Sequence, residues 1–353
     1  LARGIYTKHL MAAYDGNASS HTMTQKWTWS CTDASSAWYG QGYHNYGIAD
    51  VDWDGRDEIV YGSMVIDDNG NGLSTTGLGH GDAQHCGDFD PYRHGQEIFA
   101  CNEESPAMNY RDATTSTLYY RLTGTEDDGR ALVGNFSNST PGCMGRSTQS
   151  GMISTVTDAV LADSLNTIAW GDLNFRIYWD GDYLDEILNS PGTEKEAKIE
   201  KPGSGRLFLS SGCNMNNSSK NHPCFSGDIL GDWREEIILR NGTNIRIYTT
   251  AIPTDHRLYT LWHDMQYRQA MVWQMHAYNQ PPHPSFFLGE LEGITIAPPP
   301  LTTNGRTEIS NGATISTSYN SKHLLLDDTS DMSVAVSSGA APYILTDNAP
   351  TWV

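Results

Sequence analysis

The stretch DVDWDGRDEIV (residues 50–60) decides the fold, because an acidic turn runs directly into a hydrophobic strand pattern. Related stretches follow as DFDPYRHGQEIF (88–99), WDGDYLDEIL (179–188) and DILGDWREEII (228–238). Successive copies lie about 40, 90 and 50 residues apart, and such periods are typical of radially repeated four-stranded units. We expect the middle interval to span two units. The repeat therefore predicts an all-β chain, and within that class a β-propeller.

Short runs that resemble strands, bounded by Gly, Asp, Asn and Pro, recur along the chain, whereas helical periodicity is hard to find. The predicted strands cover residues 57–61, 96–100, 118–122, 185–188, 235–239 and 245–249. Three prolines at 298–300 end this region, so we divide the chain into a propeller region, 1–297, and a Pro-rich linker with a β-rich extension, 298–353. The extension is either a further β element or the start of a following domain.

The charge balance excludes some partners. The 353 residues include 42 acidic and 22 basic side chains, for a formal net charge of -20, which repels nucleic acid and anionic lipid. No run approaches the roughly 20 apolar residues of a membrane span. The first six residues hold neither an initiator Met nor a signal peptide, so we expect the chain to be processed or truncated.

The acidic loops have the form of calcium sites. Calcium takes six to eight oxygen ligands at flexible angles, and the carboxylates of the first loop would repel one another without a cation. Gly55 permits the chain reversal there. The alternative is a solvated surface loop, which four related copies make harder to sustain. The predicted calcium ligands are Asp50, Asp52, Asp54, Asp57, Glu58, Asp88, Asp90, Glu97, Asp180, Asp182, Asp185, Glu186, Asp228, Asp232, Glu235 and Glu236.

Two other groups of residues leave alternatives open. In GHGDAQH (79–85), His80 and Asp82 are candidate ligands of calcium or a transition metal, and His80 and His85 are alternatively hydrogen-bonded structural residues. Cys213 and Cys224 lie close together in an Asn-rich loop, where they form either a disulfide bridge or two free thiols.

With these stretches in view, the chain resembles the family eleven polysaccharide lyases, the rhamnogalacturonan lyases of saprophytic and gut bacteria. The resemblance covers roughly residues 3 to 290. Besides the Asp50 loop and residues 228–236, it rests on several motifs, which are GQGYHN (40–45), YGSMVIDDNG (61–70), TGLGHGDA (76–83), IRIYTT (245–250), HRLYT (256–260) and AYNQPPH (277–283).

The resemblance implies an eight-bladed β-propeller with several calcium ions and a substrate cleft on one face. It also implies cleavage of the rhamnosyl-galacturonate bond of rhamnogalacturonan I, a pectin, by β-elimination. Family members carry a β-sandwich and the first blades ahead of the segment that begins here, so we expect an incomplete propeller. The expected protein is a monomer, secreted or held at the cell surface or in the periplasm of a bacterium.

Elimination requires a base that removes the C5 proton of galacturonate, and the polar loop 214–220 offers one amine, Lys220. In related sequences the corresponding loop contacts the sugar, which implies sugar binding by Asn217, Ser218 and Ser219. This chain has Ser218 where Gly is usual, so the local backbone geometry departs from the family pattern. Lys220 is either the base, or a partner that stabilises charge, or a solubilising charge on an exposed loop.

Tyr278 and Asn279 offer an aromatic platform and an amide for the polysaccharide, although a tyrosine in such a turn also packs against a neighbouring blade. The alternative from another functional class is a non-catalytic, calcium-dependent carbohydrate-binding propeller. The Lys220 loop and the Tyr278 turn favour the lyase, because a purely structural calcium repeat requires neither.

Overall fold

The computed structural model describes residues 2–103, 108–124, 127–161, 173, 175–190, 196–217, 220–256, 258, 260–275, 278, 280–289, 332–334, 343–346 and 349–351. Within these residues the chain consists of antiparallel strands with a single α-helix, α1 (Met265–Trp273), which follows the short 3-10 helix η3 (Leu261–His263). The all-β class that the sequence predicts is confirmed.

Most strands follow one another in four-stranded antiparallel meanders. The first has β4 (Gly47–Ala49), β5 (Glu58–Tyr61), β6 (Met64–Ile66) and β7 (Gly72–Thr75). The second has β8 (Ala83–Gly87), β9 (Glu97–Cys101), β10 (Met108–Asp112) and β11 (Leu118–Leu122), and the third has β12 (Ala131–Gly134), β13 (Met144–Ser147), β14 (Ile153–Ser154) and β15 (Ala159–Val160).

Two further meanders share one seven-stranded sheet. They are β16 (Phe175–Ile177), β17 (Glu186–Asn189), β18 (Glu196–Lys201) and β19 (Gly205–Asn214), then β20 (Phe225–Gly227), β21 (Glu236–Asn241) and β22 (Asn244–Tyr248). A single residue pair, Asn214 and Arg240, links the two meanders. The sheet therefore reads as two neighbouring units of the repeat.

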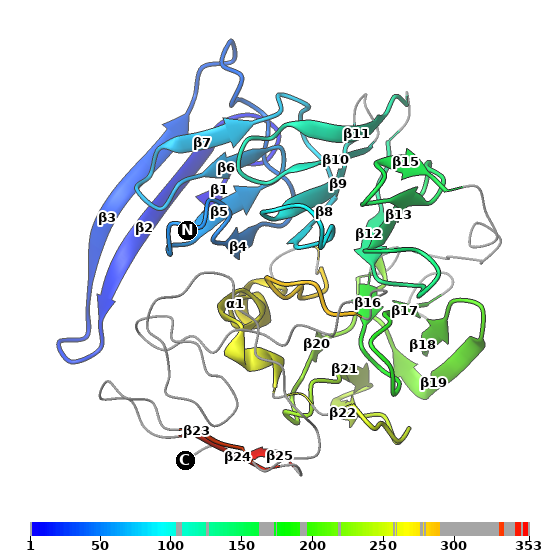
Figure 1. Ribbon diagram of the computed structural model, residues 1–353. Coiled ribbons are helices and arrows are strands. Elements are labelled where there is room, and N and C mark those ends of the chain that lie inside the picture. The colour runs from blue at the N-terminus through cyan, green and yellow to red at the C-terminus, as the bar shows by residue number, and fades with distance from the viewer. Residues whose placement is uncertain are drawn as a thin grey trace.

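Figure 1 shows these units side by side around a common centre, with the first strand of each innermost and the last strand outermost. Burial follows this order, because β12 and β16 are wholly buried while β15 and most of β22 are exposed. The apolar faces of neighbouring sheets pack on each other. Val60 of the first sheet lies in one core cluster with Ile98 of the second, and Phe99 of the second lies in another with Val133 of the third.

Helix α1 lies between the first and the last of these units. It contacts β4, and the side chain of Gln274 at its end exchanges two hydrogen bonds with the backbone of Ser226 in β20. Asp264 caps the helix by accepting from Tyr267 N. The sequence did not predict this helix, because its buried residues do not keep to an apolar stripe and include Gln266. None of the described helices is long and apolar enough to cross a membrane.

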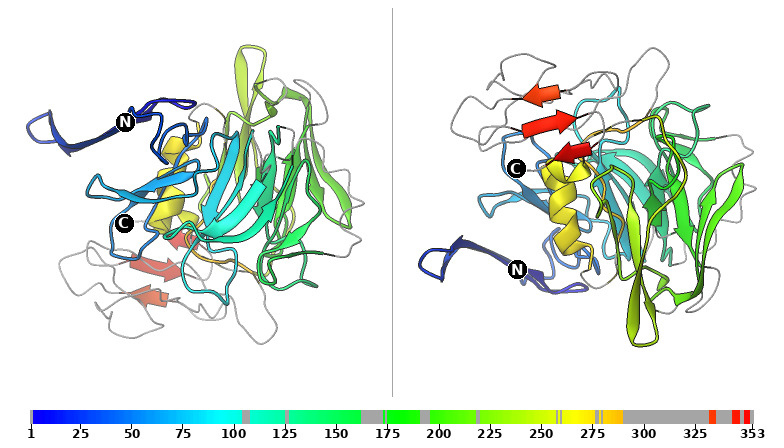
Figure 2. Two further views of the ribbon diagram at one scale, coloured as in Figure 1. Left: turned by 90° about the horizontal axis from the view of Figure 1, so that it is seen from above. Right: turned by 90° about the horizontal axis from the view of Figure 1, so that it is seen from below.

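The N-terminal residues form a three-stranded sheet of β1 (Ala2–Arg3), β2 (His9–Asn17) and β3 (Thr22–Cys31). The long β2–β3 hairpin reaches beyond the radial units, as both views in Figure 2 show. Its base is anchored to the first unit, since Met11 packs with Tyr61 and Met64, and Trp27 Nε1 donates to the carbonyl of Asp68 at 2.6 Å.

The predicted strands lie close to the observed ones. Residues 118–122 coincide with β11, and β5, β9, β17 and β21 each begin one residue later than expected. Cys213 and Cys224 are both free thiols, so the second of the two alternatives holds. In the C-terminal extension the structure describes only the sheet of β23 (Met332–Val334), β24 (Tyr343–Thr346) and β25 (Ala349–Thr351), and the prolines at 298–300 lie outside the described residues.

Candidate active site and cation sites

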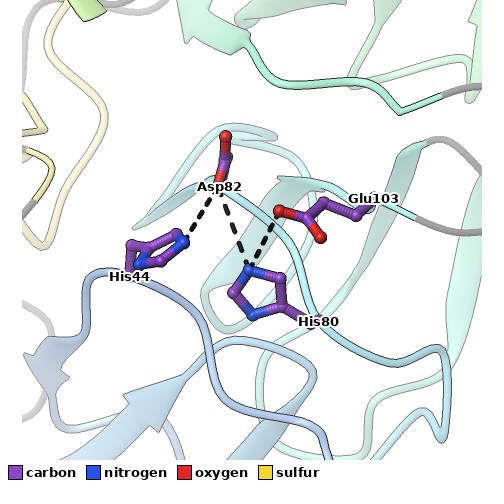
Figure 3. A group of neighbouring side chains, drawn as sticks. All are labelled: His44, His80, Asp82 and Glu103. Carbon is purple, nitrogen blue, oxygen red and sulfur yellow. Dashed lines mark ion pairs between the residues drawn. The ribbon is translucent and has the colours of Figure 1, made fainter. Parts of the chain in front are cut away.

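Four side chains whose ligand atoms all lie within 4.8 Å of one another form what we call the histidine cluster, His44, His80, Asp82 and Glu103 (Figure 3). His44 comes from the loop before β4, His80 and Asp82 from the segment that enters β8, and Glu103 from the end of β9. Nε2 of His80 lies 3.3 Å from a carboxylate oxygen of Glu103 and 3.9 Å from one of Asp82.

The hydrogen bonds of His80 fix which of its nitrogens carries the proton. Its Nδ1 lies 2.6 Å from the carbonyl oxygen of Gly42, which can only accept, so Nδ1 is the donor. In the neutral ring Nε2 then presents a lone pair toward Asp82 and Glu103. Nε2 of His80 and Oδ1 of Asp82 are both buried without a hydrogen-bond partner among the described residues. A cation between them would satisfy all of these groups, so the donor set fits a divalent metal ion.

Lys220 meets this cluster from a distant part of the chain. Its Nζ donates to Oδ2 of Asp82, 138 residues away in the sequence, and lies 4.3 Å from the centre of the Tyr278 ring. The Tyr278 ring is in turn 4.3 Å from the ring of His44. The structure therefore brings together the predicted base, the predicted aromatic platform and the two predicted ligands His80 and Asp82.

The backbone that carries Lys220 is a tight turn. The amide of Lys220 donates to the carbonyl of Asn217 at 2.9 Å, and Asn217 adopts a φ of 60°, in the left-handed region that favours glycine. Asn221 follows with a φ of 41° and anchors the turn by donating from Nδ2 to the carbonyl of Ser190. Ser218, Ser219 and Asn279 lie outside the described residues.

Three members of this region were missed in the sequence. His44 stands in a motif that carried the family resemblance, but no second ligand lies nearby in the chain. Glu103 follows β9 and lies outside the acidic loops that the repeat marks. Tyr6 places its ring 4.1 Å from that of His80 and its hydroxyl 3.1 Å from Nε2 of His44. Partial burial, and after it the carboxylate of Glu103, raises the pKa of Tyr6.

His85 is a hydrogen-bonded residue of the core, which is the structural alternative given for it in the sequence analysis. Its Nε2 lies 2.8 Å from the carbonyl of Ala131, and its Nδ1 lies 3.0 Å from Nε2 of His283. Burial lowers the pKa of His85 to about 4. The ring is therefore neutral, and it links β8 to β12 rather than joining the histidine cluster.

The first acidic loop contributes to a second group, the Asp50 cluster, in which the two sets Asp50, Asp52, Glu58 and Glu58, Asp67, Asp68 share the buried Glu58. Oε2 of Glu58 accepts from Val51 N at 2.9 Å, while its Oε1 is buried without a hydrogen-bond partner in the described part of the chain. Burial raises the pKa of Glu58 to about 8. These carboxylates fit a calcium ion, because oxygen ligands converge on an unsatisfied buried atom.

Two predicted ligands of the first loop point elsewhere. Asp54 accepts from the amide of Arg56 at 2.8 Å, and Asp57 accepts from Nε2 of Gln269 in α1 at 2.6 Å. Asp67 and Asp68, which no ligand prediction included, take their place. They follow β6 in the motif YGSMVIDDNG, whose acidic pair was the available signal.

The Asp180 loop gathers Asp180, Asp182 and Glu186 in the same manner. A lysine lies among them. Nζ of Lys201 donates to Asp180, to Asp182 at 2.6 Å and to Glu186 at 3.2 Å. Asp185 faces the other way, where it accepts from Asn135 N at 2.7 Å and lies 3.5 Å from the buried guanidinium of Arg176.

The carboxylates of the other two loops form no such group among the described residues, because protein donors surround them. In the second loop Glu97 accepts from Phe89 N and Asp90 N, Asp88 from Phe287 N, and Asp90 pairs with Arg93 at 3.3 Å.

In the fourth loop a comparable set of donors is present. Asp228 accepts from the hydroxyl of Thr260 and Leu261 N, Asp232 pairs with Arg234 at 2.6 Å, Glu235 with Arg176 at 2.9 Å, and Glu236 accepts from Ile229 N and Leu230 N.

Comparison with known proteins identifies the family to which this all-β chain belongs. The chain belongs to rhamnogalacturonan lyase family 11, since the model of that family's C-terminal domain matches residues 1–300. It is 40% identical over 306 residues to the rhamnogalacturonan endolyase YesW of Bacillus subtilis (85% of this chain, 48% of YesW). It is 38% identical over 309 residues to the rhamnogalacturonan exolyase YesX of the same organism (82% and 50%).

Solved structures agree with these sequence relations. The crystal structure of YesW superposes with a TM-score of 0.75 at 39% identity, covering 84% of this chain and 50% of that one. The rhamnogalacturonan lyase PL11 of Bacillus licheniformis gives 0.74 at 37% identity, covering 83% and 50%. The chain thus spans about half the length of the relatives it matches.

Proposed function

We propose that this chain carries the catalytic centre of a rhamnogalacturonan lyase, which cleaves the rhamnosyl-galacturonate bond of rhamnogalacturonan I by β-elimination. The observation that carries the proposal is the position of Lys220, whose amine lies against Asp82 of the histidine cluster and over the ring of Tyr278. The reaction requires a base and stabilisation of the charge that develops on the uronate, and the aromatic face offers a surface for the sugar ring.

Lys220 is the proposed base. Its neutral amine takes the C5 proton of galacturonate, the C5–H electrons form the C4–C5 double bond, and the C4–O bond breaks as the rhamnosyl oxygen departs and is protonated by water. The residues of the histidine cluster would hold a divalent cation, which supplies charge stabilisation to the uronate carboxylate when bound. Tyr278 presents its ring to the sugar, beside the amine that must reach C5.

We also propose calcium at the Asp50 cluster, and an incomplete β-propeller as the architecture that the radial units form. The calcium site is supported by Oε1 of Glu58, which is buried without a hydrogen-bond partner among the described residues. The propeller is supported by the radial order of inner and outer strands. Bound cations have an electrostatic role as well. A chain with a formal charge of -20 attracts a uronate polymer only where cations invert the local potential. Because the substrate is a polymer, the proposed location is outside the cell.

Replacement of Lys220 tests the proposal. Removing a general base costs roughly 100-fold to 10,000-fold in rate, so Lys220→Ala is expected to lose that much product formation while its melting temperature stays near the wild-type value. Lys220→Arg is not expected to restore the rate, because a guanidinium stays protonated.

The measurement is the ultraviolet absorbance of the unsaturated uronate released from rhamnogalacturonan I, with a thermal melt of each variant. Lys198→Ala is the matched control, because that lysine pairs with Glu200 at 2.7 Å on the outer part of β18. A near-wild-type rate for Lys220→Ala would place the base elsewhere. Binding of the polymer by the wild type without any unsaturated product would favour the non-catalytic alternative.

A further inference from the structure

Each of the four acidic loops ends on a buried glutamate at the start of the second strand of its unit, namely Glu58, Glu97, Glu186 and Glu236. One carboxylate oxygen of each glutamate accepts from the backbone of its own loop, as Val51 N donates to Glu58 and Trp179 N donates to Glu186, both at 2.9 Å. The same hydrogen bonds, from loop amides to the glutamate, therefore hold all four loops. They differ in what approaches from the next strand.

The strand register shows which residue that is. In the first unit Ile59 pairs with Ile66, so the neighbouring position brings Asp67 opposite Glu58. In the unit of the Asp180 loop Ile187 pairs with Glu200, so the same position brings Lys201 opposite Glu186. The equivalent partner of Glu97 is Asp112, and Glu236 accepts from the hydroxyl of Thr249 at 2.9 Å. One structural position thus holds a carboxylate, an ammonium or a hydroxyl, depending on the unit.

The ammonium of Lys201 fills the Asp180 loop. It has three N–H donors, and the structure gives it three carboxylate acceptors, on Asp180, Asp182 and Glu186. Its side chain is only 14% exposed, so the charge lies within the loop rather than on the surface. In the Asp50 cluster Arg56 pairs with Asp68 at 3.0 Å, but its side chain is 65% exposed and lies on the surface.

We propose that Lys201 is the resident cation of the Asp180 loop, which therefore takes no calcium ion, whereas the Asp50 cluster, with Asp67 at the same register position, does. The ammonium of Lys201 occupies the oxygen atoms that would bind a metal ion, and it fills the space between them. The sequence expectation of calcium at Asp180, Asp182 and Glu186 is thereby reversed. The half of the proposal that concerns Asp67 rests on the calcium site proposed above, and the half that concerns Lys201 does not.

A reciprocal exchange tests both halves through calcium bound per chain at equilibrium dialysis. Lys201→Asp reproduces the arrangement of the first unit and is expected to bind one more calcium than the wild type. Asp67→Lys is expected to bind one fewer. Lys198→Asp, on the same strand but outside the loop, is the matched control and is expected to leave the number unchanged. Asp180→Asn is also expected to leave it unchanged in the wild-type background.

The outcomes separate the two halves. A folded Lys201→Asp that gains no calcium, or an Asp180→Asn that loses one, overturns the assignment of Lys201. An Asp67→Lys that keeps the full number overturns the calcium site of the Asp50 cluster and leaves Lys201 unaffected. If Lys201→Asp fails to fold, Lys201→Met removes the charge at similar length. In the presence of chelator, Lys201→Met is expected to melt at a lower temperature than the wild type. An unchanged melting temperature would contradict the role of Lys201 as a buried structural cation.

Discussion

The histidine cluster and the Asp50 cluster are both groups of side chains that could hold a metal ion, but the chain assembles them differently. The Asp50 cluster comes from residues 50–68, which form one loop and the two strands next to it. The histidine cluster combines side chains from three segments, and Lys220 and Tyr278 reach it from the segments that follow β19 and α1. The first cluster is a local product of one repeat unit. The second exists only when several units are in place.

This difference separates the roles of the two clusters. A local group of carboxylates closes its own loop, so its neutralisation contributes to the stability of one unit. A group assembled from distant segments has no loop to close and holds its unsatisfied atoms beside an amine and an aromatic ring. We therefore expect changes in the Asp50 cluster to affect mainly stability, and changes in the histidine cluster to affect mainly product formation.

Within the two clusters, the largest expected effect is that of His80→Ala. Loss of a group that helps to hold charge stabilisation at a reaction centre costs about 100-fold to 1,000-fold in rate, so lyase activity is expected to fall by that amount. The melting temperature is expected to fall as well, because the buried ring donates to the carbonyl of Gly42, so rates are compared per folded molecule. Activity and thermal melts of wild type and variant check this. A variant that melts early yet keeps its rate per folded molecule would reverse the assignment of roles.

Glu58→Gln is expected to have the opposite profile. The amide removes the charge of the buried carboxylate at nearly constant shape, and a lost charged hydrogen bond or ligand costs about 1–3 kcal/mol of unfolding free energy. Activity of the folded fraction is expected to remain. Excess chelator is expected to lower the melting temperature of the wild type but to have less effect on this variant. The control is Glu200→Gln, which pairs with Lys198 at the surface. Equal losses in both variants would show that burial of Glu58 is not the cause.

The same contrast explains how far the sequence predicts this protein. Strands next to an acidic loop were placed within one residue, because the glutamate that ends the loop also begins the strand. His80, Asp82, Lys220 and Tyr278 could each be selected from short motifs. Their assembly, and the participation of His44 and Glu103, could not, because it depends on which segments the ring of sheets brings together.

Which of the acidic loops takes a calcium ion could not be predicted from the sequence, for a related reason. Their carboxylates are visible in the sequence, but two of the positive charges that pair with them come from other strands, Lys201 from β18 and Arg176 from β16. Lys201 forms an ion pair with Asp180, and Arg176 forms one with Glu235. Arg93 pairs with Asp90 within the same loop. On the assignment proposed for Lys201, a motif predicts an acidic loop, whereas the residue opposite its glutamate on the neighbouring strand determines whether that loop takes a metal ion.

The smallest expected effect concerns the stability of the fold in acid and the strand β8. Asp82 lies just before β8, and His85 within β8 forms the core pair with His283. Burial lowers the pKa of both rings, that of His85 to about 4, and Arg176 opposes their protonation as well. A histidine whose pKa is lower in the folded state binds fewer protons there than in the unfolded chain, so stability is lost as the pH falls from the unfolded pKa toward the folded one.

For His85 this window runs from its ordinary pKa of 6.5 down to about 4. One pH unit below the ordinary value, the penalty for this ring is about 1 kcal/mol of unfolding free energy. Denaturant unfolding of the calcium-saturated protein at a series of pH values is expected to show this slope. In His85→Gln, which lacks the titrating ring, the slope is expected to be shallower by one proton. Identical slopes in the two proteins would mean that protonation of His85 does not contribute to the acid sensitivity of the fold.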